Sequence, residues 1–102
     1  NKLTLGYVAQ IEGKVVGYIF AEGRALEFGS PLCGWIFAIA VDPEFARKGI
    51  ALRLCREVCL KFKALGIHTI RTLVRKDDVA ILSFFRASGF RAGPFMELEL
   101  EL

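Results

Sequence analysis

The stretch from Cys33 to Ala51, CGWIFAIAVDPEFARKGIA, joins an apolar run to a polar, glycine-containing junction and to the start of a periodic segment. From Cys33 to Val41 only Gly34 dilutes the apolar residues, and polar residues do not alternate with them, which predicts a strand covered on both faces. Pro43 cannot donate to a strand ladder and favours a turn. The stretch therefore predicts a buried strand that leads through a short turn into a helix.

The segment after this junction has the spacing of an amphipathic helix. Between Lys48 and Leu65 the apolar positions are separated by four, three, four and three residues: Ala51, Cys55, Val58, Phe62 and Leu65. Gly66 is typical of the residue that follows a helix. A shorter helix is expected over Val79–Ala87, with Asp78 as its N-cap and Gly89 at its end.

Two strands are expected before the central stretch. Tyr7–Ile11 and Val15–Ala21 are rich in β-forming residues and flank a short turn, which predicts a hairpin. Gly17 lies inside the second strand and indicates a bulge or a close approach of another backbone. Residues Glu22–Leu32 have the composition of a loop and are the best candidate for disorder.

Two further strands are expected after the long helix. Thr69–Val74 predicts one of them, and Met96–Leu102, in which Met or Leu alternates with Glu, predicts a half-exposed last strand. The resulting order is three strands, a helix, a strand, a helix and a strand. It predicts an α/β or α+β fold with a mixed sheet and helices packed on its faces.

Composition and charge limit the classes of protein to which the chain can belong. With 102 residues, 54% of them apolar and 25% charged, residues 1–102 suit one domain and are neither disordered nor collagen-like. No uninterrupted apolar run reaches the roughly 18 to 20 residues of a membrane helix. The net charge of +3 is spread along the chain and disfavours a nucleic-acid partner. Three cysteines cannot all pair and form no zinc motif, which indicates a reducing compartment, the cytoplasm, and no metal site.

The junction has the features of an anion site. The first turn of a helix leaves backbone N–H groups without intrahelical partners at the positive end of the helix dipole. Gly49 and Ala51 add no bulk there, while Arg47 and Lys48 add positive charge, so a pyrophosphate could approach the backbone. The same residues also suit close packing of a helix on a sheet beside a solvated basic corner. GxxxxGK[ST] and GxGxxG are absent, which excludes a Walker A loop and a dinucleotide fingerprint.

Two motifs resemble those of the GCN5-related N-acetyltransferase (GNAT) superfamily. Ala46–Ala51, ARKGIA, follows Val41-Asp42-Pro43 and is similar to the family loop Gln/Arg-x-x-Gly-x-Gly/Ala, which follows a strand ending in Val-x-Pro. Asp78–Phe90 resembles the later family motif Asn-x-x-Ala-x-x-x-Tyr, followed by Gly-Phe. The order of elements also agrees over nearly the whole chain.

The resemblance implies an N-acetyltransferase that moves an acetyl group from acetyl-CoA to a primary amine of a small molecule or peptide. It implies a largely antiparallel sheet that splays at its central strand and holds the pantetheine arm and the pyrophosphate of CoA. The implied cofactor-binding residues are Ile39, Ala40, Val41, Ala46, Arg47, Lys48, Gly49, Ile50, Ala51, Asp78 and Phe85. It also implies that the chain is the CoA-binding core of the domain, without the usual first strand and first two helices.

Three positions depart from the family pattern. Ala46 stands in place of Gln or Arg, Asp78 in place of Asn, and Phe85 in place of a Tyr that protonates the leaving CoA thiolate. A phenyl ring has no proton to give. The apolar strand Trp35–Ile39 also lacks the acidic general base of many members. A catalytically inactive CoA-binding or protein-interaction module of the same fold is therefore the alternative to an active enzyme.

The sequence does not identify the catalytic residues. Six polar residues could move protons in place of the missing groups: Glu22, Glu27, Asp42, His68, Ser83 and Ser88. Cys55 and Cys59 lie on or beside the apolar stripe of the long helix and are typical of core packing rather than of a metal site. The row of Met and Leu side chains at the C-terminus offers an edge through which a homodimer could form.

Overall fold

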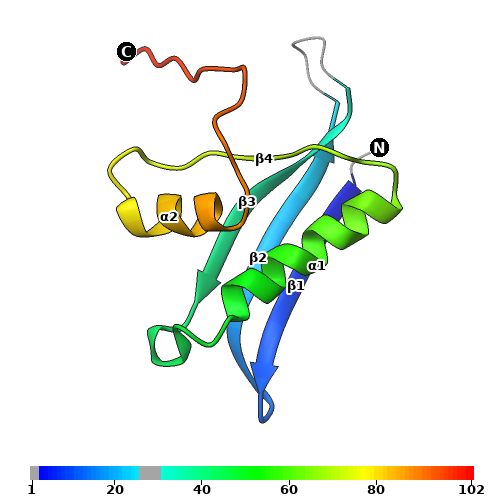
Figure 1. Ribbon diagram of the computed structural model, residues 1–102, viewed down its shortest axis with the longest axis vertical. Helices are drawn as coiled ribbons and strands as arrows, with labels where there is room; N and C mark the ends of the chain where they lie inside the picture. The colour runs from blue at the N-terminus through cyan, green and yellow to red at the C-terminus, as the bar shows by residue number, and fades with distance from the viewer. Residues whose placement is uncertain (1–2, 26–30) are drawn as a thin grey trace.

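The computed structural model describes residues 3–25 and 31–102, and its four strands form a single sheet (Figure 1). The elements are β1 (Leu3–Ile11), β2 (Lys14–Arg24), β3 (Cys33–Val41), the 3-10 helix η1 (Pro43–Phe45), α1 (Ile50–Ala64), β4 (Ile70–Thr72) and α2 (Val79–Ala87). The strand order is β1-β2-β3-β4, in which only β3 and β4 are parallel. The predicted α+β fold with a mixed, largely antiparallel sheet is confirmed.

The predicted hairpin is confirmed and is longer than expected. Its two turn residues, Glu12 and Gly13, have φ angles of 50° and 80°, the positive values that a two-residue hairpin turn of matching twist requires. β2 continues to Arg24, so the predicted loop Glu22–Leu32 begins later than expected, and residues 26–30 lie outside the described residues. Gly17 does mark a close approach, because a Cβ there would lie 3.1 Å from the carbonyl oxygen of Ala40.

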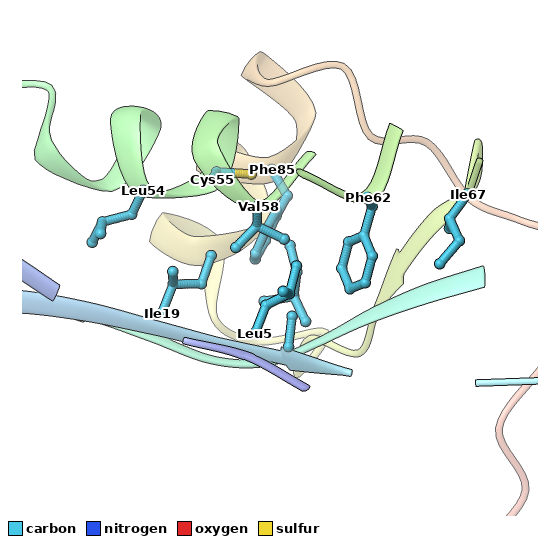
Figure 2. Packing of buried hydrophobic residues seen from close by; sticks show 10 residues of the cluster. Leu5, Ile19, Leu54, Cys55, Val58, Phe62, Ile67 and Phe85 are labelled. Carbon is cyan, nitrogen blue, oxygen red and sulfur yellow. The ribbon is translucent and has the colours of Figure 1, made fainter. Parts of the chain in front are cut away.

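Both helices pack on the same face of the sheet, which we call the covered face (Figure 2). Side chains from α1, α2, three strands and the connection after α1 meet there in one buried cluster: Leu5, Ile19, Ala21, Ile36, Leu54, Cys55, Val58, Phe62, Ile67 and Phe85. Gly34 lets α1 approach β3, since an added Cβ would lie 2.6 Å from the ring of Phe62. The predicted apolar stripe of α1 is thus the side of the helix that builds the core.

The other side of the sheet, the open face, carries Val8, Tyr18, Phe20 and Phe37. The prediction that β3 is covered on both faces is wrong for the described part of the chain, because Ile36 is 3% exposed but Phe37 is 48% exposed. The apolar run shows that both faces of β3 carry apolar side chains, but no described element packs over the open face. Phe20 and Phe37 instead lie against each other, with ring centroids 6.3 Å apart.

The predicted last strand is not present. Met96–Leu102 has no regular structure, and the side chains of Met96, Leu98 and Leu100 are at least 83% exposed. Figure 1 shows this tail running away from the sheet. Alternating apolar and polar residues determine which side chains share a face of a strand. A strand also needs a neighbouring strand for its backbone hydrogen bonds. The outermost strand, β4, has only three residues and offers little to pair with.

Among residues 3–25 and 31–102, no helix combines the length and the apolar character that crossing a membrane requires.

Candidate functional site

The sheet opens between β3 and β4. The two strands pair at only three positions, of which the last joins Ile36 to Thr72. β4 ends there, while β3 continues to Val41. The Thr72 hydroxyl donates a 3.0 Å hydrogen bond to the Ile36 carbonyl oxygen at the point where the strands part. Beyond it, β3 is paired only on its β2 side, and the backbone edge of Phe37–Val41 faces the opening.

A cavity of about 260 Å³ occupies this opening. Its walls come from four elements or connections: Tyr18 of β2, Ile36–Ile39 of β3, Thr72–Arg75 at and after β4, and Asp78, Ile81 and Phe85 at and within α2. The structure therefore brings three of the predicted cofactor-binding residues together here, namely Ile39, Asp78 and Phe85. Phe37 forms a bulge at the same place, because Phe20 pairs with Ala38 and Ala21 pairs with Ile36.

The remaining predicted cofactor-binding residues lie at the end of β3 and at the start of α1. Ala40 and Val41 end the strand, and residues 46–51 form an exposed or half-exposed turn into the helix. Arg47 and Gly49 have φ angles of 63° and 78°. This left-handed backbone is easy for Gly and uncommon for Arg. The left-handed residues give the turn a defined backbone shape. The space beside Gly49 is open, because a Cβ added there would meet no atom within 4 Å.

The start of α1 has no cap. Gly49 is the N-cap residue and provides no side-chain hydrogen bond, and the first turn contains no acidic residue. The first hydrogen bond of the helix runs from the Arg53 N–H to the Gly49 carbonyl oxygen, 3.0 Å. The N–H groups of Ile50, Ala51 and Leu52 come before it and donate to no acceptor in the described part of the chain. Uncapped N–H groups at the positive end of a helix dipole can bind an anion.

The start of α2 is capped, as the sequence predicts. The Asp78 carboxylate accepts a 3.1 Å hydrogen bond from the Ile81 N–H. Just before it, Arg75 forms an ion pair with Asp77 at 2.8 Å. The hydrogen bond from Arg75 lowers the pKa of the Asp77 carboxyl. Asp78, a predicted cofactor-binding residue, lines the cavity, but its carboxylate already accepts a hydrogen bond from the helix backbone.

Phe85 has a structural role in addition to its place on the cavity wall. It is 3% exposed and lies edge-on to Phe84 and Phe90, with ring centroids 5.1 and 4.9 Å away. The helix therefore presents a hydrocarbon ring, not a hydroxyl, to the opening. No proton transfer can start from this position.

Six polar residues were candidates to move protons: Glu22, Glu27, Asp42, His68, Ser83 and Ser88. Glu27 lies outside the described residues, and none of the other five lines the cavity. Asp42 caps η1 by accepting a 3.0 Å hydrogen bond from the Glu44 N–H. The Ser88 hydroxyl donates to the Phe84 carbonyl oxygen at 2.9 Å. The polar side chains of Asp42 and Ser88 thus already form hydrogen bonds within the fold.

Tyr18 is one of the cavity residues that the sequence interpretation missed, and it carries a hydroxyl group. It lies on β2 and pairs with Ala40 of β3, for which the family resemblance implies cofactor binding. The signal that could have found it is the alternation within β2, in which Ile19 is buried on the covered face and Tyr18 points the other way. Only the strand order shows that β2 is the neighbour of β3.

Cys55 and Cys59 fit the predicted core role. Cys33 and Cys55 are buried, Cys59 is half-buried, and all three are free thiols. A hydrogen bond from the Cys55 thiol lowers the pKa of Cys59 to about 7 and raises the pKa of Cys55. Within the ranges that the structure describes, no group of three or more His, Cys, Asp or Glu side chains could hold a metal ion.

The arrangement fits a long, flexible thioester cofactor such as acetyl-CoA. An unpaired strand edge can pair with amide groups of a pantetheine arm, and the uncapped helix start can bind a pyrophosphate. The two lie next to each other, since β3 leads through η1 directly into α1. The cavity between β3, β4 and α2 then leaves room for the thioester end.

Comparison with known proteins supports this interpretation. The model of the acetyltransferase (GNAT) family matches residues 2–90. An aminoglycoside acetyltransferase from an uncultured soil metagenomic sample, in complex with sisomicin, is 21% identical with a TM-score of 0.83, and the match covers 98% of this chain and 66% of that one. Aminoglycoside N-acetyltransferase AAC(6')-Iy in complex with CoA is 20% identical with a TM-score of 0.82, over 95% of this chain and 75% of that one.

A third match has a different acceptor in its name. The ribosomal-protein-alanine N-acetyltransferase from Brucella melitensis biovar Abortus 2308 is 14% identical with a TM-score of 0.81, over 97% of this chain and 71% of that one. The chain spans just under two thirds, 66%, of the two soil metagenomic acetyltransferase structures. The family model, in contrast, matches most of the chain. The chain therefore belongs to the GNAT acetyltransferase family.

Proposed function

We propose that the chain binds acetyl-CoA and transfers its acetyl group to a primary amine. The observation that carries this proposal is the opening between β3 and β4 beside the uncapped start of α1. Two similar structures support it by their names, one a complex with CoA and one a complex with the bisubstrate analogue CoA-S-monomethyl-acetylneamine. Acetyl-CoA would supply the activated acyl group, and the chain would supply position and hydrogen bonds.

Each part of the site has a separate task in this proposal. The backbone of Ile39, Ala40 and Val41 would pair with the pantetheine arm, and the N–H groups from Arg47 to Ala51 would bind the pyrophosphate. Holding the thioester in the cavity beside an amine would make the reaction effectively intramolecular. A backbone N–H at the Phe37 bulge, where β3 lacks a regular partner, could stabilise negative charge on the carbonyl oxygen.

We propose the acceptor of the acetyl group only by its chemical class, a primary amine. The names of the similar structures include aminoglycosides and a ribosomal-protein alanine, and their shared chemistry is a primary amine. We propose that residues 1–102 form a single GNAT domain that lacks the usual first strand and first two helices. The uncovered apolar residues of the open face support this proposal.

The alternative is an inactive module that still binds CoA. Phe85 favours it, because this position faces the cavity without a hydroxyl group. A cytoplasmic location, supported by three free thiols, and a homodimer, supported by the exposed Met and Leu side chains of the tail, complete the proposal. We propose no nucleic-acid or membrane partner.

One pair of measurements tests the proposal and separates it from its alternative. Isothermal titration calorimetry with CoA and with acetyl-CoA should show binding with a Kd well below about 1 mM. Release of the CoA thiol is then followed with a panel of small amines and of peptides with free N-termini. Transfer above the uncatalysed rate supports the enzyme, binding without transfer supports the inactive module, and no binding at millimolar CoA contradicts both.

A further inference from the structure

Four polar side chains line the cavity between β3 and β4, and three of them are already engaged. The Thr72 hydroxyl donates to Ile36, the Arg75 guanidinium pairs with Asp77 at 2.8 to 2.9 Å, and the Asp78 carboxylate caps α2. The Tyr18 hydroxyl has no hydrogen-bond partner among the residues that the structure describes. It is thus the uncommitted proton-bearing group of the cavity.

The position of Tyr18 places this hydroxyl on the opposite side of the sheet from Phe85. Ile19 is 1% exposed on the covered face, so Tyr18, its neighbour in β2, points to the open face and is 46% exposed. Both Tyr18 and Phe85 line the same cavity. The cavity therefore passes through the gap in the sheet, with a hydrocarbon ring on the helix side and a phenol on the open side.

The phenol also lies beside the strand edge that would hold the pantetheine arm. Tyr18 pairs with Ala40 of β3, and side chains of directly paired residues stand about 4.5 to 5.5 Å apart at Cβ. A tyrosine hydroxyl reaches well beyond its own Cβ, and its neighbours on β3, Ala38 and Ala40, are too small to block it. A thioester end held in the cavity would therefore share that cavity with the Tyr18 hydroxyl.

We propose that Tyr18 is the catalytic proton donor of the acetyl transfer, in place of the hydroxyl that Phe85 lacks. This proposal rests on the proposed function. The acceptor nitrogen forms a bond to the acetyl carbonyl carbon, the carbon–sulfur bond breaks, and its electron pair stays on sulfur. Tyr18 gives its hydroxyl proton to that sulfur and regains a proton from the nitrogen, which must lose one. The products are an amide and the CoA thiol, so no other reactant is needed.

The kinetic test uses the two tyrosines of the chain as a matched pair. Tyr18→Phe should lower kcat by about 100-fold or more, the range of one proton-transfer group, with the Kd for CoA within about twofold of wild type. Tyr7→Phe removes a hydroxyl from β1, away from the cavity, and should leave both values unchanged. A Tyr18→Phe variant that binds CoA and keeps kcat within about threefold of wild type would overturn the proposal.

A second measurement does not depend on turnover. A hydroxyl beside the sulfur stabilises the thiolate of bound CoA, so the ultraviolet absorbance of that thiolate should appear at a higher pH in Tyr18→Phe, by at least about half a pH unit. Tyr7→Phe should match wild type. An unchanged midpoint in Tyr18→Phe would show that the hydroxyl does not contact the sulfur and would refute the proposal. Failure of wild type to bind CoA would instead refute the proposed function itself.

Discussion

The two α-helices begin in opposite ways. α1 starts behind Gly49, which leaves the N–H groups of the first turn without acceptors. α2 starts behind Asp78, whose carboxylate occupies the corresponding place and accepts from Ile81. Both starts have the same dipole and the same unpaired N–H groups in principle. The difference teaches that one N-cap residue decides whether a helix start is available to a ligand or is used by the fold.

The charged residues before the two helices also differ: within the described part of the chain, those before α1 are unpaired, and the arginine before α2 is paired. Arg47 and Lys48 precede α1, are exposed, and form no ion pair with another described residue. Arg75 precedes α2 and is bound to Asp77 by two hydrogen bonds. The start of α1 is therefore a positive region, whereas the start of α2 is close to neutral and contributes a carboxylate to the cavity.

The strongest way to break this comparison is to give α1 the cap that α2 has. Gly49→Asp should weaken CoA binding by about 100-fold or more, about 2.7 kcal/mol, because the new carboxylate accepts from the free N–H groups and repels the pyrophosphate. Gly49→Asn is the matched control. It tolerates the left-handed backbone equally well but adds no charge, so it should bind much better than the Asp variant. Calorimetry with CoA measures both, and equal affinities would contradict the phosphate assignment.

Removing the cap of α2 should affect stability rather than binding. Asp78→Ala should lower the free energy of unfolding by about 1 kcal/mol, or Tm by about 4 to 8 °C, since the Ile81 N–H loses its acceptor. Asp78→Asn retains an acceptor oxygen and should stay close to wild type. Thermal unfolding followed by circular dichroism checks both variants. CoA affinity should not fall in either one, and a fall would show that Asp78 binds the cofactor directly.

Neutralising the two cations before α1 should have a smaller effect. The double change Arg47→Gln and Lys48→Gln should weaken CoA binding by about three- to tenfold, because exposed charges contribute little each. The loss should shrink as salt is added, since salt screens exposed charges. Lys63→Gln, in the last turn of the same helix, is the control and should leave binding unchanged. If the loss of CoA affinity did not depend on salt, the two side chains would contribute through their shape rather than through their charge.

The middle of α1 offers a check that its start has been altered without unfolding the helix. Because the Cys55 thiol lowers the pKa of Cys59 to about 7, Cys59 should be the first cysteine alkylated by iodoacetamide, with a half-maximal rate near pH 7. Cys55→Ala should move that midpoint up toward the ordinary thiol value. Mass spectrometry of the modified peptides reads out the order. The same order should persist in Gly49→Asp, and its loss would assign the binding defect to unfolding.

The sequence predicts those features that depend on local chemistry. The turn at Glu12-Gly13, the end of β3 before Pro43, the apolar stripe of α1 and the cap at Asp78 each follow from a few adjacent residues, and the structure confirms all four. The family motif then leads to the opening between β3 and β4. These predictions succeed because the backbone preferences and hydrogen bonds involved span at most a few residues.

The incorrect or missing predictions concern neighbours that are distant in sequence. The strand expected at Met96–Leu102 fails because no adjacent strand is available to it, and the covering expected for Phe37 fails because no described element lies over the open face. Tyr18 was missed because its role depends on the pairing of β2 with β3. Periodicity reports which side of a strand is apolar, not which element will cover it.

The open face also changes how folding of this chain has to be monitored. Dyes such as ANS fluoresce on exposed apolar surface and are widely used to recognise molten globules. Val8, Tyr18, Phe20 and Phe37 present such a surface while the core on the other side of the sheet is fully packed. Bright dye fluorescence would therefore belong to the native state. The near-ultraviolet circular dichroism of the packed aromatic rings, rather than dye binding, distinguishes the folded chain from a molten one.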